Sequence, residues 1–202
     1  MNERSEIAAV LLAAGASSRM GRPKALLEYR GETLLDRHLA LYSRLCRPLI
    51  CVLGSDAGVI AAGLRRQDDA VFVLNPRPER GQLSSLQCGL RALLKCEAVF
   101  FLPCDSVAVE VSTLEAMIES WRAAGGRSAF VIPRHEGRRG HPVLMSGAMI
   151  PQMLALPAGA AARDLVRSRA EDTCYVDVDD PRVHLDIDTP GDYDALLKGV
   201  RL

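Results

Sequence analysis

The chain contains 202 residues, of which 49% are hydrophobic and 25% are charged. Its 25 basic and 25 acidic side chains balance, so the overall charge gives no electrostatic footprint for binding nucleic acid or an anionic membrane. The six cysteines include no CxxC pair, so zinc-finger spacing is absent, and no apolar run is long enough to cross a membrane. With no secretory pattern at the start, we expect a reduced, cytoplasmic protein that forms a single domain over residues 1–202.

Apolar runs of strand length alternate with segments of helical periodicity through the first two thirds of the chain. These patterns predict strands at 7–13, 48–54, 70–75, 98–103 and 128–133, and helices at 33–45, 56–66, 83–95 and 111–124. Strands that are apolar throughout indicate a sheet covered on both faces, and the strand–helix order indicates parallel connections. The sequence therefore predicts an α/β fold with a Rossmann-like, doubly wound, mostly parallel mixed sheet and helices on both faces.

The last third of the chain is less regular. The expected elements are a glycine-bearing hairpin or loop at 135–145, short helices at 147–156 and 161–169, strands at 174–179 and 183–188, and a helix beginning at Thr189 and Pro190. Ligands of open α/β sheets bind beyond the carboxyl ends of the strands. The residues that follow each expected strand are therefore the candidate site.

The segment after the first strand, LLAAGASSRMGRPKALL (11–27), combines small side chains with placed cations. Gly15 and Gly21 permit positive φ and close backbone approach, and successive N–H groups in such a turn form an anion site. Arg19 and Lys24 supply charge suited to phosphates. The GxxxxGK[ST] and GxGxxG spacings are both absent, so the residues alone leave open an anion-binding loop and an ordinary surface loop.

Carboxylates follow two of the expected strands. Asp105 lies just past an expected strand, where it would either cap backbone N–H groups or bind Mg²⁺. Asp186 and Asp188 share one face of the strand expected at 183–188, and Asp188 and Asp192 are also placed to favour the start of the last helix. If Asp105 and Asp188 meet at the ligand edge of the sheet, they would hold one metal ion between them.

The loop at 11–27 resembles the LAAGxSxRMGxxK signature of the MobA-like nucleotidyltransferases, and among them most closely the molybdenum cofactor cytidylyltransferases. The resemblance implies a fold of the nucleotide-diphospho-sugar transferase type, with a loop that wraps the triphosphate and base. The residues implied in nucleotide binding are Leu12, Ala13, Ala14, Gly15, Arg19 and Lys24. Related guanylyltransferases commonly read LAGG here, so Ala14 favours CTP over GTP.

Two acidic motifs extend the resemblance. Members of the family typically carry LPxDxP and DIDTPxDY, in which the first aspartate and the second aspartate of DID are taken as magnesium ligands. LPCD and DIDTPGDY in this chain imply Asp105 and Asp188, with Asp186 as a further candidate. The usual proline after the first motif is replaced by Val107, a departure from the family pattern that bears on the shape of the acceptor side more than on the metal.

Three further segments carry weaker signals. GQLSSLQCGL (81–90) resembles the family's GxxxSLxxGL, which implies Gly81 and Ser85 near the nucleoside, although either Ser84 or Ser85 would also suit a helix cap. On the acceptor side, His141 would be a phosphate ligand or base, or a structural residue, and Arg163 fits an altered GAR stretch. GRRGHPVLM (137–145) resembles a family segment that faces the acceptor, so Arg138 and Arg139 would either face the acceptor or be solvated. Cys104 is read as a small residue of the turn.

Together the resemblances imply transfer of CMP from CTP to the phosphate of the molybdenum-bearing pterin, with Lys24, Arg19 and Asp105 as catalytic residues. The implied partners are CTP, a molybdopterin-type acceptor and, transiently, a molybdoenzyme or chaperone. Two alternatives stay open: a nucleotidyltransferase that uses GTP or another phosphorylated acceptor, and a nucleotide-binding assembly protein without turnover. The missing proline and the altered 158–163 stretch keep the second of these open.

Overall fold

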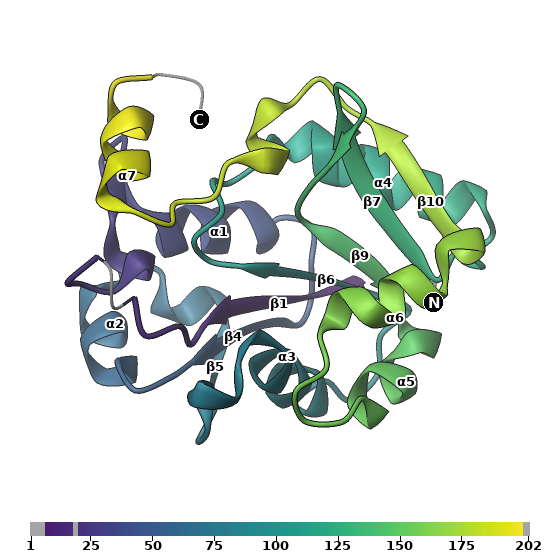
Figure 1. Cartoon of the computed structure of the whole chain (residues 1–202), viewed down its shortest axis with the longest axis horizontal. Helices are drawn as coiled ribbons and strands as arrows, with labels where there is room; N and C mark the ends of the chain where they lie inside the picture. Colours follow the sequence, from purple (N-terminus) through teal and green to yellow (C-terminus); the bar gives the residue numbers. More distant parts are fainter. Residues whose placement is uncertain (1–6, 18–19, 200–202) are drawn as a thin grey trace.

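A computed structural model describes residues 7–17 and 20–199, and a mixed sheet runs through its centre (Figure 1). The strands are β1 (Ile7–Ala13), β4 (Leu49–Leu53), β5 (Val71–Leu74), β6 (Ala98–Pro103), β7 (Phe130–His135), β8 (Arg138–Arg139), β9 (Val143–Ser146) and β10 (Thr173–Asp177). Their order is β10–β7–β9–β6–β1–β4–β5, with β8 paired to β7. Pairs involving β8 or β9 are antiparallel and the others are parallel. The predicted mostly parallel mixed sheet is confirmed.

Helices cover both faces of this sheet (Figure 1). They are α1 (Leu34–Tyr42), α2 (Ala57–Gly63), α3 (Gln82–Arg91), α4 (Val111–Ala123), α5 (Ile150–Ala155), α6 (Ala162–Ser168) and α7 (Pro190–Leu197). Strand β1 is buried throughout because its side chains alternate between two cores. Leu11 packs in the core that includes residues of α1 and α4, whereas Val10 packs in the core with α3 and α5. Among the described residues, no helix has the length and apolar character needed to cross a bilayer.

Short elements complete the described chain. A two-stranded ribbon is formed by β2 (Glu28–Tyr29) and β3 (Glu32–Thr33), and the 3₁₀ helices are η1 (Lys24–Leu26), η2 (Gln67–Asp69), η3 (Pro78–Arg80), η4 (Gly147–Met149), η5 (Ala170–Asp172) and η6 (Pro181–His184). Helix α1 begins where the Thr33 hydroxyl accepts a hydrogen bond from the Asp36 backbone N–H, at 3.0 Å. The hairpin expected around 135–145 is confirmed as β7–β8, leading into β9.

The strand expected at 183–188 is wrong. The chain instead turns through η6, where the Asp180 side chain accepts a hydrogen bond from the Arg182 backbone N–H. Beyond η6, a single antiparallel bridge joins Asp186 to Ser106. Leu185 and Ile187 produced the alternating pattern, but they pack in a small separate cluster with residues such as Leu27, away from the two cores of the sheet.

Candidate active site

A pocket of about 210 Å³ lies at the carboxyl ends of β1 and β6. It gathers eight of the residues expected on the nucleotide and metal side, namely Leu12, Ala13, Ala14, Gly15, Lys24, Gly81, Ser85 and Asp105. Residues from four separate parts of the sequence therefore line one cavity, as expected for an open α/β sheet. Arg19, expected beside Lys24, lies outside the described residues.

The loop after β1 has the tight geometry expected of it at Gly21 but not at Gly15. Gly21 has a φ of 66°, whereas the other left-handed residue of the described loop is Ser17, with φ 46°, and not Gly15. The close approach is made by Gly54 at the end of β4, where an added Cβ would lie 2.5 Å from the Ala14 carbonyl oxygen. Gly54 therefore allows a close backbone approach between the loop that lines the pocket and the end of β4.

Replacing Gly54 with alanine is expected to displace the loop at Ala14, because the obstructing atom is backbone and cannot rotate away. We expect a loss of about 1–3 kcal/mol in the free energy of unfolding and weaker nucleotide binding. Gly58→Ala in α2 is the matched control, since its added Cβ meets open space. Thermal unfolding and nucleotide titration measure both effects, and equal behaviour of the two variants would contradict the assigned role of Gly54.

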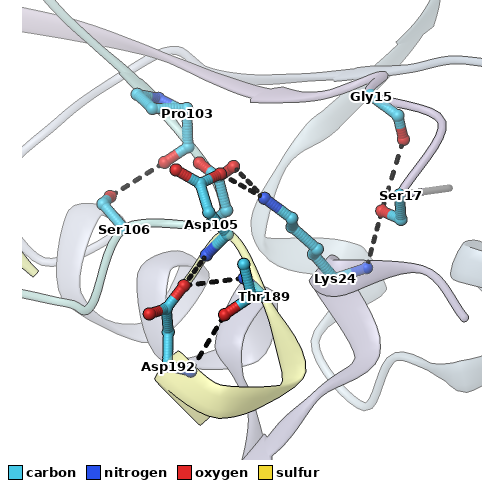
Figure 2. Close-up of polar contacts among 9 residues, drawn as sticks. Gly15, Ser17, Lys24, Pro103, Asp105, Ser106, Thr189 and Asp192 are labelled. Carbon is cyan, nitrogen blue, oxygen red and sulfur yellow. Dashed lines mark hydrogen bonds and ion pairs between the residues drawn. The ribbon is translucent and has the colours of Figure 1, made fainter. Parts of the chain in front are cut away.

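Lys24 lies between the carboxylates of Asp105 and Asp188, which come from different parts of the chain. Its Nζ donates hydrogen bonds to Asp105 Oδ2 at 2.9 Å and to Asp188 Oδ1 at 2.8 Å, and Figure 2 shows the side chain pointing toward Asp105. Its backbone N–H donates to Ser17 Oγ at 2.9 Å, which ties the start of η1 to the loop after β1. Partial burial alone would lower the pKa of Lys24, but the hydrogen bonds and charges of Asp188 and Asp105 outweigh burial and raise it.

The backbone around Asp105 is tied to the segment that carries Asp188. The Ile187 N–H donates to the Asp105 carbonyl oxygen at 2.9 Å, and the Val107 N–H donates to the Leu185 carbonyl oxygen at 2.8 Å. These bonds hold the turn after β6 beside the entry to α7, so the two carboxylates converge although 82 residues separate them. The convergence expected from the sequence is therefore present, but through paired turns and not through two sheet strands.

Capping explains Asp192 but not Asp188. Thr189 is the N-cap of α7, and its hydroxyl accepts from the Asp192 N–H (Figure 2). The Asp192 carboxylate accepts in return from the N–H groups of Asp188 and Thr189, at 3.0 and 2.7 Å. Since the helix start is satisfied in this way, the Asp188 carboxylate is left for the cation of Lys24.

The pair Asp105 and Asp188 fits a hard divalent cation. Lys24 Nζ acts as a stand-in ion, because oxygens of both carboxylates approach one positive charge within 3 Å. In the described part of the chain, no group of three or more His, Cys, Asp or Glu side chains is placed to bind a metal. Mg²⁺ commonly takes one or two carboxylates and completes its coordination with substrate phosphates and water, which matches this pair.

Asp186 lies beside this pair and feels its charge. Although the residue is exposed, the surrounding protein removes hydration from its carboxyl group, and Asp105 and Asp188 repel its charge. Lys24 opposes these effects only in part, and the pKa of Asp186 rises to about 6. Near neutral pH the ligand-free site therefore carries a third ionised carboxylate, Asp186, and its charge lowers the stability of the folded protein.

Replacing Asp186 with asparagine is expected to stabilise the ligand-free protein at pH 7. The folded-state pKa lies above the unfolded value, so the contribution of Asp186 to stability falls as pH rises from about 4 to about 6 and is level above that range. Because the residue is exposed, we expect a gain of only about 1 kcal/mol. Unfolding at pH 7 and pH 4 checks this, and a gain that is equal at both values would contradict it.

A second pocket, of about 530 Å³, adjoins the first. It contains the two residues expected on the acceptor side, His141 and Arg163, and Gln82 lines both pockets. The other polar residues of the second pocket are Arg138, Arg139, Arg167, His184 and Asp186. Cations therefore dominate this cavity, which suits a ligand with several negative charges.

The structure changes how three of these residues are read. Arg138 and Arg139 are exposed in β8, and both are among the residues that line the second pocket. Burial lowers the pKa of His141, against the opposing charge of Asp105, which favours the neutral imidazole in the ligand-free protein. Arg167 was missed by sequence reasoning, although its position one helical turn after Arg163 was a usable signal.

Comparison with known proteins finds a matching family model and several relatives. The model of the MobA-like NTP transferase domain matches residues 9–173. The molybdenum cofactor cytidylyltransferase of Escherichia coli K12 is 27% identical, with 94% of each chain covered. Nicotine blue oxidoreductase of Paenarthrobacter nicotinovorans is 30% identical, with 91% of this chain and 92% of that protein covered.

A solved structure shares the fold and much of the length. Rv0371c of Mycobacterium tuberculosis H37Rv, crystallised in complex with manganese, superposes with a TM-score of 0.75 at 28% identity, covering 97% of this chain and 100% of that one. The sheet order, the helices on both faces and this likeness confirm the nucleotide-diphospho-sugar transferase type of fold. The chain belongs to the family of MobA-like NTP transferases.

Proposed function

We propose that this protein moves CMP from CTP onto the phosphate of a molybdenum-pterin cofactor and releases pyrophosphate. The observation that carries the proposal is the arrangement of two adjoining pockets, with Lys24 and Asp105 lining the first of them and Asp188 paired to Lys24. The first pocket has the small residues and the lysine suited to a nucleotide, and the second has the cations suited to a phosphorylated acceptor. The chain would act as one domain.

The proposed reaction is an in-line displacement without a covalent enzyme intermediate. An oxygen of the acceptor phosphate bonds to the α-phosphorus of CTP, the bond from that phosphorus to the β-phosphate oxygen breaks, and its electron pair leaves with pyrophosphate. Lys24 would leave its carboxylates to neutralise the phosphates, and Arg19 is assigned the same task. Mg²⁺ held by Asp105 and Asp188 would supply charge stabilisation on the transferred phosphoryl group.

Nucleotide selection is assigned to the small residues of the first pocket. Leu12, Ala13, Ala14 and Gly15 would approach the base and the phosphates through the backbone, while Gly81 and Ser85 would lie near the nucleoside. Preference for CTP rests on Ala14 in LAAG and is supported by the cytidylyltransferase among the relatives. His141 and Arg163 would contact the acceptor from the second pocket.

The proposal extends to the cellular compartment of the reaction and to the protein that receives its product. Free cysteines, three of them buried, suit a reducing cytoplasm. The product cofactor would pass to a molybdoenzyme or chaperone that binds transiently. Although one relative is named an oxidoreductase, the grouping of a lysine with two carboxylates favours phosphoryl chemistry, because these groups neutralise phosphate and bind a metal.

Thermal unfolding with CTP, GTP, ATP and UTP, each with and without Mg²⁺, tests the donor assignment. We expect CTP to stabilise the protein most, and only in the presence of Mg²⁺. An equal response to all four nucleotides would overturn the base assignment, and no response to any of them would overturn the nucleotide site itself. A response without Mg²⁺ would contradict the role given to Asp105 and Asp188.

A further inference from the structure

A buried histidine in helix α1 contacts the turn that carries Asp105. His38 lies in α1 and is 1% exposed. Its Nε2 lies 2.9 Å from the backbone carbonyl oxygen of Ser106, the residue that follows Asp105. The contact spans 68 residues of sequence, so it joins a helix that lines neither pocket to the metal-binding turn.

The direction of this hydrogen bond is fixed by its environment. Burial lowers the pKa of His38 to about 4, so the imidazole is neutral near pH 7 and carries one N–H. A carbonyl oxygen only accepts, and the proton therefore lies on Nε2, which donates to Ser106. Within the described residues Nδ1 is buried with no hydrogen-bond partner, so the donor function at Nε2 is what this side chain contributes.

The carbonyl of Ser106 has few other ways to be satisfied. Ser106 is 2% exposed, and its hydroxyl donates within the turn to the Pro103 carbonyl oxygen at 2.8 Å (Figure 2). The paired segment bonds the turn on either side of Ser106, through the Asp105 carbonyl oxygen and the Val107 N–H. Removing the His38 donor would leave a buried carbonyl unpaired, and its peptide would then be held by the bond from the Val107 N–H to the Leu185 carbonyl oxygen and no longer by His38.

We propose that His38 is a positioning residue that holds the peptide after Asp105, so that the Asp105 carboxylate meets Asp188 in the geometry that binds a divalent metal. The inference rests on the proposed function, because it takes Asp105 and Asp188 as the metal pair. It assigns His38 a role that a merely space-filling core residue would not have. Partners of metal-binding residues typically affect metal affinity about 10- to 100-fold when they are replaced.

The matched variants are His38→Gln and His38→Met. Both side chains are unbranched and of similar length, but only glutamine carries an N–H that can donate to Ser106. Leu39→Ala, at a fully buried neighbour on the same helix, controls for loss of stability alone. Mn²⁺ binding is measured by electron paramagnetic resonance in the presence of CTP, together with thermal unfolding of each variant.

We expect His38→Met to weaken Mn²⁺ binding about 10-fold or more, His38→Gln to retain most of the affinity, and Leu39→Ala to lower only the unfolding temperature. Unchanged Mn²⁺ affinity in folded His38→Met would overturn the positioning role while the proposed function stands. Failure of the unsubstituted protein to bind Mn²⁺ with CTP would overturn both. If His38→Met does not fold, ¹⁵N-histidine spectra of the unsubstituted protein decide the question: His38 signals that do not move on adding Mg²⁺ and CTP overturn the role.

Discussion

Replacing Lys24 with glutamine is expected to lower turnover about 1,000-fold and, at the same time, to strengthen Mn²⁺ binding in the absence of nucleotide. Turnover is expected to fall because Lys24 is the cation that lines the first pocket among the described residues. Mn²⁺ binding is expected to strengthen because Nζ occupies oxygens of both Asp105 and Asp188, so a metal ion and the lysine compete for the same carboxylates. Pyrophosphate release and Mn²⁺ titration measure the two effects.

Arg22→Gln is the matched control for Lys24→Gln. Arg22 is exposed and close in sequence, but its guanidinium lies over the Tyr193 ring, at 5.5 Å, and not at the carboxylates. Loss of either cation makes the surroundings more negative, so a general effect of charge would strengthen Mn²⁺ binding in both variants. If Lys24→Gln binds Mn²⁺ no better than Arg22→Gln does, Lys24 is not the ion that holds the carboxylate pair.

Replacing Asp105 with asparagine is expected to lower turnover by at least as much, about 1,000-fold, and to remove metal-dependent nucleotide binding. Asparagine keeps the size of the side chain but loses the charge that a divalent ion requires. Asp105 is also the less exposed partner, at 26% against 62% for Asp188, so its charge is less screened by water. Asp188→Asn should therefore reduce metal binding to a smaller extent.

Asp194→Asn controls for the loss of one acidic side chain near this site. Asp194 lies in α7, is exposed, and is not among the residues that line the two pockets. It should leave turnover and Mn²⁺ binding unchanged. Near-normal turnover in Asp105→Asn, measured with saturating Mg²⁺, would show that the carboxylate is not part of the reaction centre.

The sheet was predictable because its strands carry an unambiguous pattern. Strand β1 is aliphatic along its whole length and is buried on both faces, so its run of apolar residues alone predicts its position. Residues that follow strands, such as Asp105 and Gly81, were expected at the ligand edge on the same topological ground. Both residues line the first pocket.

The contacts that build the site could not be predicted in the same way. Lys24 meets carboxylates 81 and 164 residues away, and no local pattern records such pairs. The segment 183–188 shows how a local pattern misleads, since Leu185 and Ile187 alternate as in a strand but serve a separate small cluster. His38 is one of the buried residues of α1, and only its distance to Ser106 reveals a further role.

The most direct test of the account is a transfer assay with CTP labelled at the α-phosphate and purified molybdopterin-type acceptor. The account predicts that the label moves to the acceptor, that one pyrophosphate is released for each transfer, and that the reaction requires Mg²⁺. Label recovered only as CMP, or pyrophosphate release that is independent of the acceptor, would contradict the central claim that the two adjoining pockets hold donor and acceptor for a single transfer.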